Sequence, residues 1–188
     1  RLAPEEKSVL QAASVVGTDV PFEVLRAVAD VPPDELRRHL AQLQSAEFLY
    51  ETNLFPELEY TFKHALVQDA AYDSLLKSRR QQLHAKIARV IEARFPNIKT
   101  TEPEVLAHHL TAAGLSEAAI PVWQDAGELA SKRMAMTEAI AHLNQGLELI
   151  PTLAWSSQRD TSELGLRSRL GTAWRAFRGP GAPDVWTS

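Results

Sequence analysis

Residues 46–66 read AEFLYETNLFPELEYTFKHAL and contain a change of periodicity. Phe48 and Tyr50 alternate with other residues, and a second alternating run, which ends at Phe62, follows the turn-like stretch 53–57. Such alternation places every second side chain on one face of a β-strand. The segment therefore predicts a two-stranded hairpin.

Three helix-like segments precede the hairpin. The first opens with Pro4 and two acids, carries apolar residues at helical spacing and stops at Gly17. The second follows Pro21 and the third follows Pro32, each with its own apolar stripe. Three helices followed by a hairpin is the layout of a winged-helix module. We therefore expect a mainly α protein with a winged-helix domain over residues 1–63.

The stretch after the hairpin is helical in its periodicity, with one predicted break. Ser78 and Gln81 form a capping-box pair, in which each side chain bonds an otherwise unpaired backbone N–H. We place the break at Lys77. Residues 64–99 are therefore expected to form connecting helices.

Residues 96–100 are predicted to be a linker, because proline and polar residues interrupt the helical pattern there. Thr101 and Glu104 form a second capping-box pair, which predicts the start of a further helix. From this point the sequence becomes repetitive. We expect helical hairpins of tetratricopeptide type over residues 100–188.

The repeats are visible as two similar runs, one that begins at Glu117 and one that begins at Glu138. The second run continues to Pro151 and resembles the second helix of a tetratricopeptide repeat, while residues 170–179 resemble the first helix of the next repeat. A generic array of helical hairpins is the alternative. In either case each hairpin buries its apolar face only against a neighbour, so the array offers a surface for an unknown protein partner.

Composition excludes several classes of protein. The chain has 188 residues and no cysteine, which excludes a disulfide framework, a thiolate zinc site and a cysteine nucleophile. No run approaches the roughly 18 apolar residues of a membrane span, and no secretory signal is present. We therefore expect a cytoplasmic protein without membrane contact. The start at Arg1 and the end at Ser188 indicate a piece of a longer protein.

No motif for catalysis is found. The phosphate loop, the dinucleotide-binding turn, the zinc-protease helix and the serine-hydrolase elbow are all absent from the sequence. Adjacent His108 and His109 would point about 100° apart on a helix and would not converge on a metal. His39, His84 and His142 are expected to be solvated surface residues. We therefore expect no catalytic residue, no metal and no cofactor in this chain.

Charge is unevenly distributed along the chain. Residues 30–62 carry seven acids and two bases, whereas residues 63–99 carry eight bases and three acids. A DNA-binding regulator is an alternative function, and its reading residues on the third helix would be Arg37, Arg38, His39 and Gln42. Because the acidic segment would repel phosphates, nucleic acid is a disfavoured partner.

His64 falls where the hairpin ends and the next helix begins. A donor at this position would lie next to backbone N–H groups that favour anions. Two interpretations remain open. His64 either caps or packs at the junction, or it senses a phosphate.

The segment Lys63-His64-Ala65-Leu66 resembles the Met-His-Asp-Leu type of motif in signal-transduction ATPases with numerous domains. In these proteins the motif ends a winged-helix domain that follows the nucleotide-binding core. The resemblance implies that His64, with Lys63 beside it, senses nucleotide by contact with the β-phosphate of ADP. Ala65 replaces the aspartate, so the supporting role of that aspartate is unfilled.

The chain more closely resembles the region after the ATPase core in bacterial proteins that join a class III adenylate/guanylate cyclase domain, an AAA-type ATPase and tetratricopeptide repeats. The phrases that carry the likeness lie at residues 6–17, 46–51, 60–66 and 106–109. The resemblance implies a parent protein that binds ATP or ADP with Mg and whose ATPase domain contacts this chain in cis. Lys77, Arg79 and Arg80 lie on the basic helices after the hairpin, and they either dock on that core or its nucleotide or belong to a solvated helix face.

Three functions follow from these patterns. The leading one is a non-catalytic relay, which passes the nucleotide state of the upstream ATPase core to the repeats. The parent would then have ATPase activity, and a linked nucleotide cyclase is an option. The alternatives are the DNA-binding regulator and a passive protein-interaction scaffold.

Overall fold

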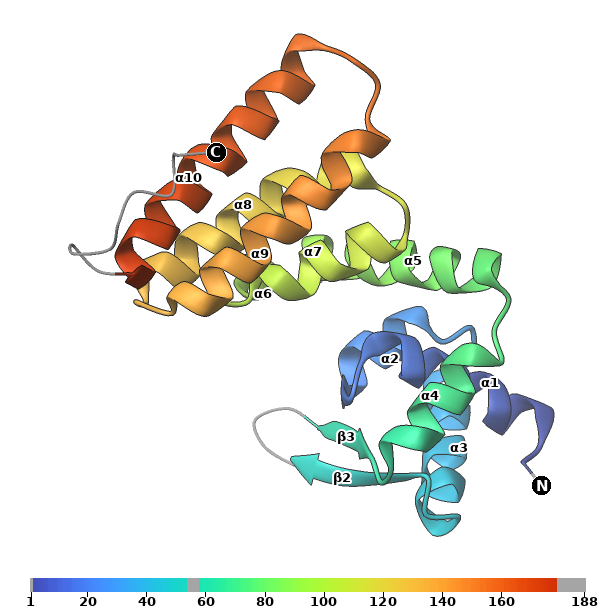
Figure 1. Cartoon of the computed structure of the whole chain (residues 1–188). Coiled ribbons are helices and arrows are strands. Elements are labelled where there is room, and N and C mark those ends of the chain that lie inside the picture. The colour runs from blue at the N-terminus through green and yellow to red at the C-terminus, as the bar shows by residue number, and fades with distance from the viewer. Residues whose placement is uncertain (1, 54–57, 179–188) are drawn as a thin grey trace. The chain divides into compact units, whose positions relative to one another are not determined.

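The computed structural model describes residues 2–53 and 58–178, and they divide into two compact units (Figure 1). The first unit is Arg1–Phe95 and the second is Pro96–Ser188. The described residues are mainly helical, with one small antiparallel sheet, which confirms the predicted mainly α class. None of the described helices is both long and apolar enough to span a bilayer.

The first unit begins with three helices and three strands in the chain order α1, β1, α2, α3, β2, β3. Their bounds are α1 Pro4–Val16, β1 Asp19–Pro21, α2 Phe22–Val28, α3 Pro33–Ser45, β2 Leu49–Asn53 and β3 Glu59–Phe62. The predicted helices and hairpin strands are confirmed, whereas the predicted turn lies largely outside the described residues. Sequence reasoning missed β1, which pairs antiparallel with β3 and makes the sheet order β1-β3-β2.

Local chemistry explains the limits of α1. The backbone N–H of Ala3 donates to the Glu6 carboxylate at 2.8 Å, which satisfies a group at the start of the helix. Gly17 follows the last turn with a φ of 152°, a conformation that other residues rarely adopt. The core beneath these helices includes Leu25, Leu36 and Leu40, all of them fully buried.

Two more helices complete the first unit, α4 Ala65–Asp73 and α5 Lys77–Arg94. The predicted break is confirmed, but the capping box at Ser78 is wrong. The N-cap is Leu76, and Ser78 already lies inside the first turn of α5. Helices α4 and α5 both contact α1, so they belong to the same compact unit.

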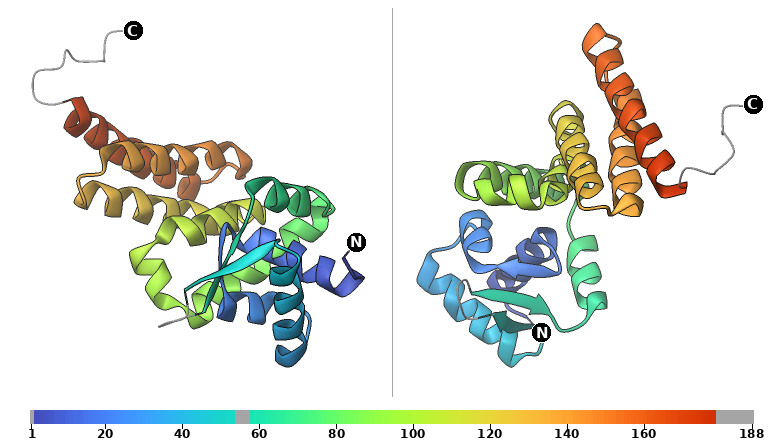
Figure 2. Two further views of the ribbon diagram at one scale, coloured as in Figure 1. Left: turned by 90° about the horizontal axis from the view of Figure 1, so that it is seen from below. Right: turned by 90° about the vertical axis from the view of Figure 1, so that its left-hand side faces the viewer.

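The second unit contains α6 Pro96–Thr101, α7 Pro103–Ala112, α8 Ser116–Lys132, α9 Met136–Leu149, a short 3-10 turn Ile150–Thr152 and α10 Ser157–Arg178. The views of Figure 2 show α8, α9 and α10 side by side, and they pack in that order. The helices predicted at the two repeated runs are confirmed. Of the run at 170–179, the described part is helical, and Gly179 lies outside the described residues.

Two predictions at the start of the second unit are wrong. Residues 96–100 belong to helix α6 instead of a linker. The Thr101 hydroxyl donates to the backbone carbonyl of Asn97 at 2.9 Å, so it does not cap the next helix. Helix α7 instead follows Glu102, with Pro103 at its first position, where a missing N–H is tolerated.

Two glycines allow close packing in the second unit. A Cβ placed on Gly127 of α8 would lie 2.5 Å from Cγ of Leu143 on α9. A Cβ placed on Gly146 of α9 would lie 2.8 Å from Cδ2 of Leu166 on α10. Since Leu143 and Leu166 are fully buried, each leucine packs directly against the backbone of the neighbouring helix.

Candidate functional site

His64 lies at the N-terminus of α4, directly after β3. It is the N-cap residue, with an extended backbone whose carbonyl accepts a hydrogen bond from the N–H of Val67 at 2.9 Å. Its side chain is exposed and makes no capping hydrogen bond. Leu66 is 80% exposed in the same turn. The corner thus presents an imidazole and an apolar side chain at the start of a nine-residue helix.

Lys63 is paired with a carboxylate beside this corner. Its Nζ lies 3.0 Å from Oε1 of Glu47, and its backbone N–H donates to the carbonyl of Phe48 at 3.1 Å. The Lys63 ammonium donates a hydrogen bond to Glu47 and holds the pKa of that carboxyl below its usual value. Any phosphate that bound here would compete with Glu47 for Lys63.

The three predicted docking residues lie past the other end of α4. Lys77 is exposed and begins α5, so it is separated from His64 by the whole of α4, whose nine residues span about 14 Å at 1.5 Å each. Arg80 lies over the ring of Tyr72 at 4.8 Å, and its Nη1 is 3.3 Å from Oδ1 of Asp73. These residues and His64 therefore do not form one site.

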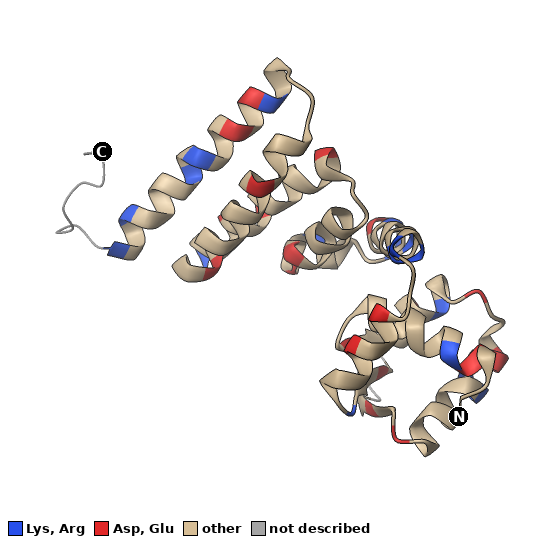
Figure 3. Ribbon diagram, turned by 45° about the vertical axis from the view of Figure 1, so that its right-hand side comes forward, with Lys and Arg blue, Asp and Glu red and all other residues tan. Residues whose placement is uncertain are grey.

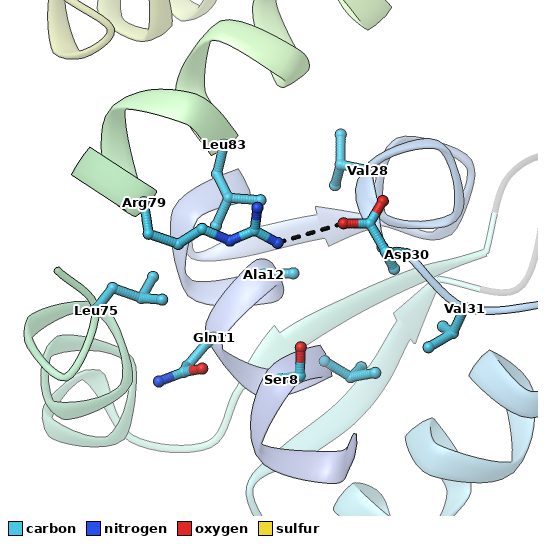
Figure 4. Close-up of a pocket in the computed structure, with 11 residues that line it drawn as sticks. Ser8, Gln11, Ala12, Val28, Asp30, Val31, Leu75, Arg79 and Leu83 are labelled. Atoms are coloured by element: carbon cyan, nitrogen blue, oxygen red, sulfur yellow. Dashed lines mark hydrogen bonds and ion pairs between the residues drawn. The ribbon is translucent and has the colours of Figure 1, made fainter. Parts of the chain in front are cut away.

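Arg79, the third of them, takes part in a cluster around Asp30. Its Nη2 lies 3.3 Å from Oδ2 of Asp30, as the dashed line in Figure 4 marks. Nζ of Lys86 lies 2.7 Å from Oδ1 of the same carboxylate and donates to the carbonyl of Val28 at 3.0 Å. The hydrogen bond from Lys86 is the main reason that the pKa of Asp30 is lowered. This cluster ties the segment after α2 to α5.

The pocket in Figure 4 lies next to this cluster, between α1, the segment after α2, and α5. Its cavity volume is about 50 Å³. Pockets that hold small-molecule ligands are typically about 300–1,000 Å³. This pocket can therefore accept a few waters but not a nucleotide.

The uneven charge of the sequence is partly neutralised within the first unit. The acidic segment supplies Asp30 and Glu47, and the basic segment supplies Lys63, Arg79 and Lys86 as their partners. Figure 3 shows the basic and acidic residues on the ribbon. Sequence reasoning missed these pairs because their members lie far apart along the chain.

The prediction that His39 and His84 are solvated is wrong, since they are 9% and 2% exposed. His142 is half-buried and stacks on Trp123 with ring centroids 5.5 Å apart. His109 is buried, and its ring lies edge-on to that of His108. Across residues 2–53 and 58–178, no group of three or more His, Asp or Glu could hold a metal ion.

His84 joins α5 to α4. The hydroxyl of Tyr72, near the end of α4, lies 3.1 Å from Nε2 of His84, and the two rings meet edge to face. His84 is buried and Tyr72 is half-buried, so a specific hydrogen bond and a ring contact link α4 to α5 in a partly buried setting. The sequence held no signal for this pair, since neither residue belongs to a motif.

The third helix presents fewer polar side chains than expected for DNA reading. His39 is buried in α3, and the guanidinium of Arg37 lies over the ring of Phe22 at 4.7 Å. Arg38 and Gln42 are exposed. Two of the four suggested reading residues therefore already make contacts inside the first unit.

Comparison with known proteins found one similar curated protein. It is an uncharacterized protein of Rhizobium meliloti (strain 1021), 32% identical over 171 residues, a match that covers 88% of this chain. This chain spans only 16% of the length of that relative. No protein-family model matches the sequence, and no solved structure matches it.

Proposed function

We propose that this chain is a non-catalytic regulatory region of a signal-transduction ATPase of the cyclase-linked type. In this proposal the first unit relays the nucleotide state of an upstream ATPase core to the helical second unit, which binds a protein partner. ATP or ADP, with Mg, would be held by the parent protein and not by this chain alone.

The arrangement of the first unit supports the winged-helix interpretation. Three helices precede a hairpin in the predicted order, and β1 joins the hairpin as a third strand. The helical pairs of the second unit support the repeat interpretation, because small residues at Gly127 and Gly146 let the neighbouring helices approach closely. The length of the Rhizobium meliloti relative is consistent with a large multidomain parent.

The observation that carries the proposal is the position of His64. An exposed imidazole at the N-cap of α4 can donate to an anion, and the first turn of the helix adds backbone N–H groups and a favourable dipole. This is the position at which the resembling ATPases place their ADP-sensing histidine. The adjacent, exposed Leu66 offers an apolar contact for the ATPase core.

In this proposal the relay runs through α4. His64 is the N-cap residue of α4. Tyr72, in the last turn of α4, forms a hydrogen bond with His84 on α5. If this nine-residue helix moves as a rigid body, displacement of its N-terminus also shifts this partly buried hydrogen bond. A double-mutant cycle between His64 and Tyr72, with bound ADP as the readout, measures the coupling along this route.

The experiment is to purify the full-length parent and quantify the ADP that remains bound. His64→Ala should lower the bound fraction, whereas His108→Ala, a change at an exposed histidine of the second unit, should not. Unchanged ADP and unchanged output in His64→Ala would refute the sensing role. A parent sequence without a phosphate loop upstream of this region would refute the ATPase class itself.

A further inference from the structure

A polar groove lies between α8 and α10 in the second unit, with a cavity volume of about 340 Å³. Seven residues line it: Gln124, Ser157, Gln158, Thr161, Ser162, Gly165 and Arg169. None of these seven carries a carboxylate, and all but the glycine offer an amide, a hydroxyl or a guanidinium. Its chemistry is therefore that of a binding surface for polar or anionic groups.

The groove is long enough for an extended chain. Ser157 and Arg169 are twelve residues apart on α10, which corresponds to about 18 Å at 1.5 Å per residue. An extended peptide covers this length with about five residues. A single inorganic anion would use only one end of such a surface.

Gly165 determines how the middle of the groove is built. A Cβ placed there would lie 3.1 Å from Nε2 of Gln124 and 3.3 Å from Nη1 of Arg169. Without that Cβ, Gln124 donates to the backbone carbonyl of Ser162 at 3.1 Å, and Arg169 donates to the carbonyl of Gly165 at 3.2 Å. The glycine thus lets an amide from α8 and a guanidinium from α10 converge over the same turn.

Arg169 retains donors for a ligand. Its Nε forms a long ion pair with Glu128, and the distance of 3.8 Å from Nε to Oε2 is beyond hydrogen-bond distance. Glu128 lies closer to Lys132, at 2.8 Å. A guanidinium has five N–H donors, so donors beyond the one bound to Gly165 can face a carboxylate in the groove.

We propose that this groove binds an extended acidic peptide segment, with a ligand carboxylate on Arg169 and polar backbone groups on Gln124, Gln158 and the nearby hydroxyls. The inference rests on the proposed protein-binding role of the second unit and names the chemistry of its partner. The carboxylate belongs either to an Asp or Glu side chain or to a chain terminus. Nucleic acid fits poorly, because phosphate backbones need several cations and the groove lining supplies one.

The test uses this chain and three fluorescein-labelled pools of degenerate octapeptides, with binding followed by anisotropy. One pool has glutamate at alternate positions and an amidated C-terminus, the second has glutamine there with the same amide, and the third has glutamine with a free C-terminus. Binding of the first pool at least about tenfold tighter than the second assigns a side-chain carboxylate, and preference for the third assigns a terminal one. Equal or absent binding of all three pools overturns the proposal.

Two alanine variants separate binding from folding. Gly165→Ala adds a favourable helix residue but pushes the ends of the Gln124 and Arg169 side chains aside by a few tenths of an ångström, so acidic binding should fall about two- to threefold without loss of stability. Gly171→Ala is the matched control on the same helix, since its Cβ would meet nothing within 4 Å. If both variants bind like the unaltered chain, the groove is not the site.

Two charge variants test the role of Arg169. Glu128→Gln removes the competing carboxylate and should tighten acidic binding by about two- to fivefold. Arg169→Gln should abolish the preference for acidic over neutral peptide. Retention of that preference would overturn the assignment. Because no nucleotide enters these measurements, their failure is distinct from failure of the ADP relay.

Discussion

The packing of Gly127 against Leu143 gives the sharpest prediction about the second unit. In Gly127→Ala the new Cβ would start 2.5 Å from Cγ of Leu143 and 2.7 Å from Cδ2. Carbon atoms in contact prefer about 3.5–4.0 Å, so α8 and α9 must separate or Leu143 must leave its rotamer. Overpacking costs about 1–3 kcal/mol, and an approach as short as 2.5 Å belongs to the upper part of that range, about 2–3 kcal/mol, of which the better helix propensity of alanine returns about 1 kcal/mol. We expect a net loss of about 1–2 kcal/mol in the free energy of unfolding.

Urea unfolding followed by tryptophan fluorescence is the suitable assay. All four tryptophans of the chain lie in the second unit, so this signal is specific to it. Gly171→Ala, at an open position of α10, should instead stabilise by about 0.5–1 kcal/mol. In a Leu143→Ala background, Gly127→Ala should no longer destabilise, because the clashing side chain is gone. Equal or greater stability of Gly127→Ala in the unaltered background would refute the close packing of these helices.

Three further predictions concern the first unit and can be measured by amide hydrogen exchange. Asp30→Asn should destabilise the first unit by less than about 1 kcal/mol, since the carboxylate that binds Lys86 is mostly exposed. Because folding lowers the pKa of Asp30, the stabilisation by its carboxylate is present at neutral pH and should vanish as the pH falls below about 4. An equal difference between the two proteins at low pH would contradict it. Tyr72→Phe keeps the ring but loses the hydrogen bond to His84, and should cost about 0.5–1.5 kcal/mol; no change would exclude that bond as a link between α4 and α5. His39→Leu should stabilise by about 1 kcal/mol, because Nδ1 of this histidine is buried without a hydrogen-bond partner, and a loss of stability would show that the ring is satisfied.

Sequence patterns predicted the elements that strong local signals define. Pro4 and Gly17 bound α1, and the alternation around Tyr50 and Tyr60 marked the hairpin strands. The strand β1 was missed because three residues are too short for any periodicity, and its pairing with β3 depends on tertiary contact. Thr101 failed as a cap because its hydroxyl bonds backward to Asn97, an alternative that sequence spacing does not distinguish.

Among the candidate sites, too, the sequence predicts local features but not contacts between elements. His64 could be predicted at a helix start, because the end of a hairpin is a local feature. The hydrogen-bond partner of buried His84 is Tyr72, which lies on another helix, and no spacing rule predicts this contact. The groove around Gly165 is equally hidden, since it arises from a side chain of α8 that reaches over α10. Both features depend on contacts between helices, which local sequence patterns do not predict.

We propose that the corner at His64 holds a phosphate of ADP, and the dissociation rate of fluorescently labelled ADP from the full-length parent tests this most directly. Glu47→Gln frees Lys63 from its carboxylate partner, so ADP release should become about two- to fivefold slower. His64→Ala should make release faster. Because misfolding cannot slow the release of ADP, opposite effects of the two variants would support phosphate binding at His64. Release rates equal to that of the unaltered protein in both variants would contradict it.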